Sequence, residues 1–160
     1  MIKQYFVFVL VLASFLAGAK EQTEKHAIAS VLDKFHQAAA NANADKYLNL
    51  LNDDAVFLGT DASERWTKPE FTKFVQPYFS QGKGWSYVST QRNVSLLPTA
   101  TVAFFDELLH HKIYGICRGT GVLTKTKQGW KISQYNLSLP IPNDIAVEVV
   151  ESVKTYELHK

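Results

Sequence analysis

The sequence has little cysteine, little excess charge of either sign and no cluster of metal-binding residues. The single cysteine, Cys117, excludes an internal disulfide framework and a cysteine-rich zinc site. Lys and Arg total 17 against 15 Asp and Glu, so we expect no phosphate-tracking surface and no nucleic-acid partner. The 5 histidines have no ligand spacing with the carboxylates, and we therefore expect neither a metal nor another cofactor.

The chain also lacks an apolar run of the length that a membrane-spanning helix needs. The run from Tyr5 to Leu16 is shorter than the roughly 20 residues required. It follows Lys3 and precedes Ala17-Gly18-Ala19, which has small residues at the two positions that signal peptidase reads. We therefore predict that residues 1–19 are a signal peptide, with an uncleaved anchor as the alternative. The mature protein would be exported, periplasmic or secreted, and would have no membrane contact after cleavage.

The remaining composition is that of one packed domain, because 46% of the 160 residues are apolar. Apolar residues recur at helical spacing in the first half and alternate after Gly84, which predicts helices first and antiparallel strands later. Thr67 and Glu70 have the spacing of a capping box at the start of a helix. The predicted helices are 21–42, 45–51, 67–79 and 145–156, and the predicted strands are 55–59, 85–96, 101–110, 113–125 and 130–139. This order is typical of an α+β domain.

Several stretches, in this order and spacing, resemble the SnoaL-like branch of the nuclear transport factor 2-like superfamily. They are Asn52–Phe57, Phe57–Asp61, Val102–Glu107, Arg118–Leu123 and Gly129–Ile132. The resemblance implies a cone, in which a curved antiparallel sheet wraps around three N-terminal helices and a pocket opens between them. We divide the chain accordingly into a signal peptide at 1–19, a SnoaL-like domain at 20–142 and an extra C-terminal helix or tail at 143–160.

Two carboxylates are candidates for a catalytic base, Asp61 at the expected pocket rim and Asp106 in a predicted strand. Asp61 follows Gly59 and Thr60, so its alternative role is to cap a turn. Asp106 and Glu107 are neighbours in the strand and must point to opposite faces, and the apolar residues on both faces leave the inner one undecided. Arg118 on the next strand would either pair with one of these acids or bind an anion or carbonyl in the pocket.

The resemblance also indicates a set of pocket residues. Relatives often have histidines at the places of Gln134 and Asn136, whereas amide side chains can hydrogen-bond a ligand but cannot act as a base near neutral pH. The candidate ligand-pocket residues are Tyr47, Phe57, Trp66, Arg118, Gln134 and Asn136.

These observations support two functions. The first is a homodimeric pocket domain that binds a small, partly apolar ligand, with the second subunit covering the outer sheet face. The alternative is an isomerase, cyclase or dehydratase that transfers a proton next to a carbonyl, without a metal, and with Asp61 or Asp106 as base. The absence of an identifiable histidine base favours the first hypothesis, the ligand-binding domain, over the enzyme.

Overall fold

The computed structural model describes residues 2–159 and contains helices followed by a sheet, as the periodicities predict. The helices are α1 (Ile2–Ala40), α2 (Ala44–Asn49), α3 (Lys68–Phe79), the 3-10 turn η1 (Asn143–Ile145) and α4 (Ala146–Glu157). The strands are β1 (Leu51–Leu58), β2 (Arg65–Thr67), β3 (Val88–Leu96), β4 (Val102–His111), β5 (Gly115–Thr126) and β6 (Gly129–Ser138).

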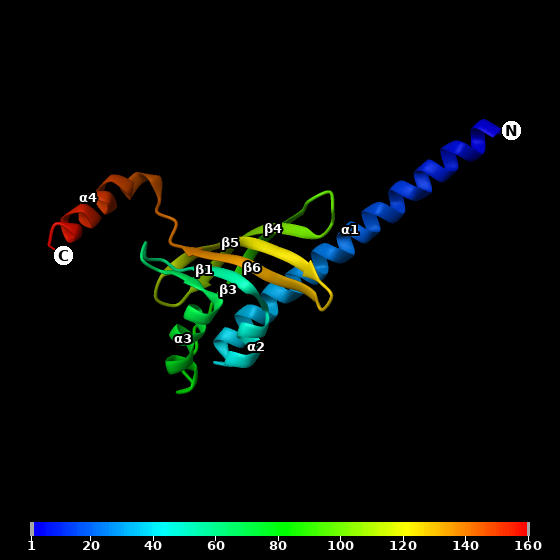
Figure 1. The fold of residues 1–160 in the computed structure, drawn as a ribbon. Coiled ribbons are helices and arrows are strands. Elements are labelled where there is room, and N and C mark those ends of the chain that lie inside the picture. Colours follow the sequence, from blue (N-terminus) through cyan, green and yellow to red (C-terminus); the bar gives the residue numbers. More distant parts are fainter. Residues whose placement is uncertain (1, 160) are drawn as a thin grey trace.

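All the strands join in one sheet with the order β2-β1-β6-β5-β4-β3. The β3, β4, β5 and β6 strands pair antiparallel in sequence order, which confirms the predicted hairpins. The last strand, β6, pairs in parallel with β1, which joins the first strands of the chain to the later four. Figure 1 shows α2, α3 and the second half of α1 on one side of this curved sheet, the arrangement of the expected cone.

The core lies where α1 crosses the inner face of the sheet. Ile28, Leu32 and Phe35 recur at helical spacing and are almost fully buried, so one face of α1 covers the sheet. Phe105 and Ile132 supply apolar contacts from the opposite side. Because both layers are apolar and continuous, burial fixes how the helix sits over the strands.

Both ends of the chain extend away from this body (Figure 1). The α1 helix begins at Ile2 and runs without a break past Ala19, well before the helix start predicted at residue 21. The signal peptide and its cleavage stay predictions. Within the part of the chain that the structure describes, no helix combines the length and apolar character needed to span a membrane. The C-terminal helix is present as predicted, and α4 contacts η1, the short turn that precedes it.

Candidate functional site

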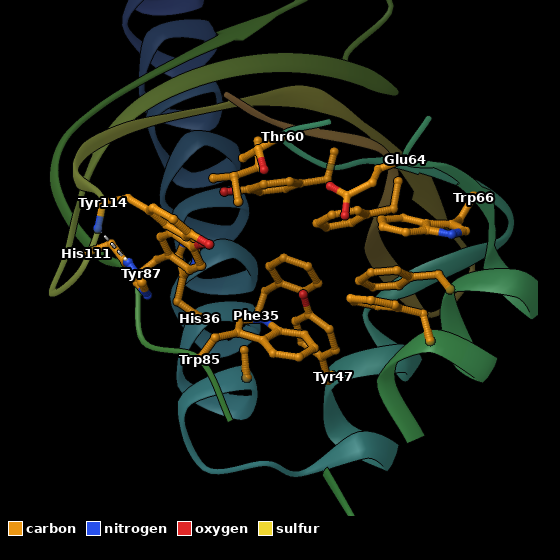
Figure 2. Close-up of a pocket in the computed structure, with 16 residues that line it drawn as sticks. Phe35, His36, Tyr47, Thr60, Glu64, Trp66, Trp85, Tyr87, His111 and Tyr114 are labelled. Carbon is orange, nitrogen blue, oxygen red and sulfur yellow. Dashed lines mark hydrogen bonds between the residues drawn. The ribbon is translucent and has the colours of Figure 1, made fainter. Parts of the chain in front are cut away.

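A cavity of about 280 Å³ opens between the helices and the inner face of the sheet. Figure 2 shows the 16 residues that line it, and most of them are aromatic. They are Phe35, His36, Ala39, Tyr47, Phe57, Thr60, Glu64, Trp66, Phe71, Phe74, Trp85, Tyr87, His111, Tyr114, Tyr135 and Leu137.

The aromatic rings of the wall pack on one another and hold the cavity in shape. Phe57 from β1 stacks on Phe71 of α3 with 4.0 Å between ring centroids, and Trp66 stacks on Phe74 at 4.7 Å. Such ring pairs are stabilising beyond the area they bury. Since the rings come from both the sheet and α3, the packing of these elements sets the shape of the wall.

The mouth of the cavity carries a second aromatic group. The His111 ring lies between two tyrosines, 4.6 Å from Tyr87 and 4.8 Å from Tyr114 by ring centroids. The backbone amide of Tyr114 donates a hydrogen bond to Nδ1 of His111, which fixes the orientation of the imidazole. Tyr114 is 54% exposed, so this stack borders the solvent and the cavity is accessible.

A buried polar cluster lies behind the inner end of the cavity. Glu107 on β4 is only 1% exposed, and its carboxylate oxygens contact three side chains. Oε1 lies 2.7 Å from Nε2 of His36 and accepts a hydrogen bond from the Tyr135 hydroxyl at 3.1 Å, while Oε2 accepts from Nε of Arg92 at 2.8 Å. His36 and Tyr135 also line the cavity, so they connect the buried carboxylate to it.

The charges in this cluster set the ionisation of Glu107. Burial raises the pKa of its carboxyl. The His36 hydrogen bond and the His36 and Arg92 charges lower that pKa by more than burial raises it, so the net shift is downward. Burial and the nearby Glu107 charge raise the pKa of Tyr135 well above its usual value. The cluster is therefore an ionised carboxylate held by neutral and cationic donors.

A different carboxylate, that of Glu64, lies on the cavity wall itself. Its backbone carbonyl accepts a hydrogen bond from the Gly59 amide at 2.8 Å, which closes the loop after β1. Its side-chain Oε2 accepts from the Asp61 amide at 3.2 Å. In Figure 2 the Glu64 carboxylate points toward the middle of the cavity, with Trp66 beside it.

Of the residues predicted for the pocket, Tyr47, Phe57 and Trp66 line the cavity. Tyr47 is buried on α2, and burial raises the pKa of its hydroxyl. Asp61 does not line the cavity. Its Oδ1 accepts hydrogen bonds from the Ser63 amide at 2.8 Å and the Ser63 hydroxyl at 2.6 Å, so it caps the turn, the alternative role considered for it.

Asp106 and Arg118 lie on the outer face of the sheet, both exposed and away from the cavity. The alternation of β4 turns Glu107 inward and therefore turns its neighbour outward. Asp106 accepts a hydrogen bond from the Asn93 amide group at 3.0 Å. Arg118 is not the partner of the buried acid, because Arg92 on β3 occupies that place.

Gln134 and Asn136 also face away from the cavity. The register of β5 and β6 shifts between the pairs Val122–Gln134 and Leu123–Ile132, which inserts an extra residue, Ser133, into β6. The bulge reverses the alternation expected from Trp130 and Ile132 onward. Tyr135 and Leu137 consequently point inward, where the sequence pattern placed the two amides.

His36, Arg92 and Tyr135 were not predicted as site residues, and the sequence left open whether Asp106 or Glu107 points inward. His36 follows Phe35 and precedes Ala39 on the buried side of α1, a spacing that could have placed it at the sheet. A glutamate among apolar strand residues was also a signal that a cationic partner lies nearby. The sequence cannot supply the β3–β4 register that pairs Arg92 with Glu107.

The histidines and the cysteine of the described residues are placed as follows. Within residues 2–159, no group of three or more His, Cys, Asp or Glu side chains is arranged to hold a metal ion. Cys117 is fully buried, as expected for a small apolar residue in a strand, and burial raises the pKa of its thiol.

An α+β cone with a pocket between its helices and its curved sheet is the nuclear transport factor 2-like fold. Residues 28–142 match the SnoaL-like domain, and the chain therefore belongs to the SnoaL-like family. No curated protein matches the chain.

Solved structures of the same fold are similar to this chain at low identity. A nuclear transport factor 2-like protein of unknown function from Pseudomonas putida has 14% identity and a TM-score of 0.62, over 77% of this chain and 90% of that one. A protein from Streptomyces avermitilis, named provisionally as a dehydratase, has 12% identity and a TM-score of 0.66, over 76% of this chain and 99% of that one. At these identities the similarity shows the fold alone.

Proposed function

We propose that this protein binds a small, largely apolar ligand that contains a planar or aromatic group. The observation that carries the proposal is the aromatic wall of the cavity, which remains open at its mouth beside Tyr114. A mostly apolar wall with a few polar groups is typical of small-molecule sites. The cavity volume of about 280 Å³ is at the lower end of the roughly 300–1,000 Å³ of ligand pockets, which favours a ligand of one or two rings.

A cavity-filling variant tests this function directly. Ala39 lines the cavity from α1, and Ala39→Leu would fill part of it without disturbing the helix. We expect the wild type to bind tert-butylbenzene in isothermal titration calorimetry and Ala39→Leu to bind it at least about tenfold more weakly. The matched control is Ala27→Leu, the same change on the exposed side of α1. Absence of wild-type binding, or equal binding by Ala39→Leu, would contradict the proposal.

We also propose that the protein is exported and works as a homodimer. The signal-like segment before Lys20 supports export, and the intact mass of the exported product would show whether residues 1–19 are removed. Exposed apolar side chains on the outer sheet face support the homodimer. Phe104 is 51% exposed and Ile116 is 63% exposed, which is unusual for a sheet face that stays in water.

A second candidate function is proton transfer next to a carbonyl, with His36 as base in place of Asp61 or Asp106. The observation that favours it is the contact of 2.7 Å between Nε2 of His36 and Glu107, on a histidine that lines the cavity. If Nε2–H donates to Glu107, Nδ1 carries the lone pair and can accept a proton, and the carboxylate stabilises the resulting imidazolium.

Deuterium exchange at the methyl group of acetophenone, followed by NMR, tests the second function. We expect exchange above the buffer rate in the wild type, loss in His36→Gln and no change in His110→Gln, which alters an exposed histidine of β4. If the wild type exchanges the methyl protons no faster than buffer does, the catalytic function is contradicted, whereas the ligand-binding function is not.

A further inference from the structure

The cavity wall carries an unusual distribution of charge. Glu64 contributes the only carboxylate among the lining residues, and no lysine or arginine is among them. Any positive charge on His36 is balanced by the Glu107 carboxylate at 2.7 Å. His111 has its Nδ1 occupied by the backbone amides of Ile113 and Tyr114. The one uncompensated full charge that faces the cavity is therefore negative.

The position of Glu64 is fixed by the loop that carries it. A Cβ atom on Gly59 would lie 2.1 Å from Oε2 of Glu64, so only glycine at this place allows the side chain to fold across the end of β1. Among the described residues, no Lys, Arg or His forms a salt bridge with Glu64. Its hydrogen bond to the Asp61 amide leaves most of its acceptor capacity unused.

Aromatic side chains lie on both sides of this carboxylate. Figure 2 shows Glu64 pointing into the space between Trp66 on one side and Tyr87 and Tyr114 on the other. The negative field of Glu64 reaches across this space, because it contributes, after burial and other neighbours, to raising the pKa of Tyr87. Aromatic faces attract cations, and the attraction is greatest where water is excluded.

From this geometry we infer that the ligand is an organic cation, an amine or quaternary ammonium group attached to an apolar body. The cationic group lies against Glu64 between the Trp66 and Tyr87 rings, and the apolar body occupies the space lined by Phe57 and Phe71. The inference rests on the proposed ligand-binding function and adds the charge of the ligand. A carboxylate next to aromatic rings supplies both the ionic and the cation–π contributions.

Three probes of similar shape and different charge test the inference: phenyltrimethylammonium, neutral tert-butylbenzene and benzoate. We expect the wild type to bind the cation about tenfold or more tightly than the neutral probe, and benzoate most weakly. Glu64→Gln removes the ionic contribution and should remove most of the preference for the cation while keeping the affinity for tert-butylbenzene. Glu70→Gln removes one carboxylate from the exposed start of α3, outside the cavity, and should keep the preference.

The outcomes separate the inference from the function on which it rests. Equal binding of the cation and the neutral probe by the wild type, or a preference as large in Glu64→Gln as in the wild type, overturns the cation inference and leaves the binding function standing. Binding of none of the probes overturns the binding function itself. Thermal unfolding followed by circular dichroism shows whether Glu64→Gln is folded, and Gly59→Ala, which displaces Glu64, should reproduce the loss of preference if it folds.

Discussion

Nε2 of His36 lies 2.7 Å from Oε1 of Glu107, a contact that joins the long helix α1 to strand β4 of the sheet. The same carboxylate also contacts Arg92 of β3 and Tyr135 of β6, so one side chain connects four elements of the fold. Arg92 in turn contacts Asp33 of α1 at 2.7 Å. The cluster therefore fixes α1 against the strands at the point where the cavity ends.

Removal of the Glu107 side chain should destabilise the protein strongly. Glu107→Ala removes the buried carboxylate that pairs with Arg92, a mostly buried side chain, and leaves it only the exposed carboxylate of Asp33. Breaking a buried ion pair in this way costs about 3–5 kcal/mol of unfolding free energy. Urea denaturation measures the change, and Asp106→Asn, on the exposed face of the same strand, should cost less than about 0.5 kcal/mol. A loss from Glu107→Ala as small as that of the control would contradict the role assigned to the cluster.

The same carboxylate should make stability depend on acid pH. The folded-state pKa of Glu107 lies below its ordinary value of 4.5, so the unfolded chain binds the proton more readily than the folded one. Its contribution is fully present above that value and is lost as the pH falls through the lower folded-state pKa. Glu107→Gln should flatten this part of the stability profile, as measured by urea denaturation between neutral pH and pH 3. A slope unchanged by the substitution would assign the acid sensitivity to other carboxylates.

The fold was largely predictable because it depends on periodicity, which the sequence shows. The alternation of the four later strands placed them to within a few residues, and the helical spacing of Ile28, Leu32 and Phe35 located the part of α1 that covers the sheet, although not its start at Ile2. The carboxylate of Glu70 accepts hydrogen bonds from the Thr67 amide and hydroxyl, which places the start of α3 at the predicted cap. Strand β2 was missed because three residues are too few to show a period.

The site was much less predictable because it depends on register. Two apolar faces on β4 left open whether Asp106 or Glu107 points inward, and the answer lies in how the strand packs on α1. The residues around Ser133 give no indication of a bulge. The bulge nevertheless turns Tyr135 toward the cavity and Gln134 away from it. One inserted residue therefore changes the expected pocket composition from amide to aromatic.

The hydroxyl of Tyr87 should titrate late. Burial, then the nearby Cys117, Tyr114 and Glu64, raise its pKa to about 12 from an ordinary value of 10.0. Because the folded-state pKa is raised, its contribution to stability is present below pH 10 and is lost as the pH rises through about 12. Tyrosinate absorbance in an alkaline titration should lose one late-titrating group in Tyr87→Phe. Glu64→Gln should lower the pKa of Tyr87. If the wild type and Glu64→Gln titrate identically, the Glu64 charge does not affect the Tyr87 hydroxyl.

The outer face of the sheet should hold the proposed homodimer together. Phe104 and Ile116 point away from the cavity, and Asp106 and Arg118 lie on the same face, so two copies related by a twofold axis could bury the apolar residues and pair opposite charges. An Ile116→Asp substitution would place a carboxylate inside that interface. We expect dimer mass for the wild type in light scattering at micromolar concentration and monomer mass for Ile116→Asp, with an unchanged circular dichroism spectrum.

A matched substitution at Val147 distinguishes an interface effect from a general effect of added charge. Val147 is an exposed residue of α4, the helix that extends away from the sheet in Figure 1, so Val147→Asp adds the same group at a distance from the sheet. This variant should remain dimeric. A monomer mass for the wild type would contradict the homodimer. A dimer mass for Ile116→Asp would show that the dimer interface does not include the surface around Ile116. In either case the exposed Phe104 and Ile116 side chains would require a different partner, since apolar groups on a sheet face are rarely left in water.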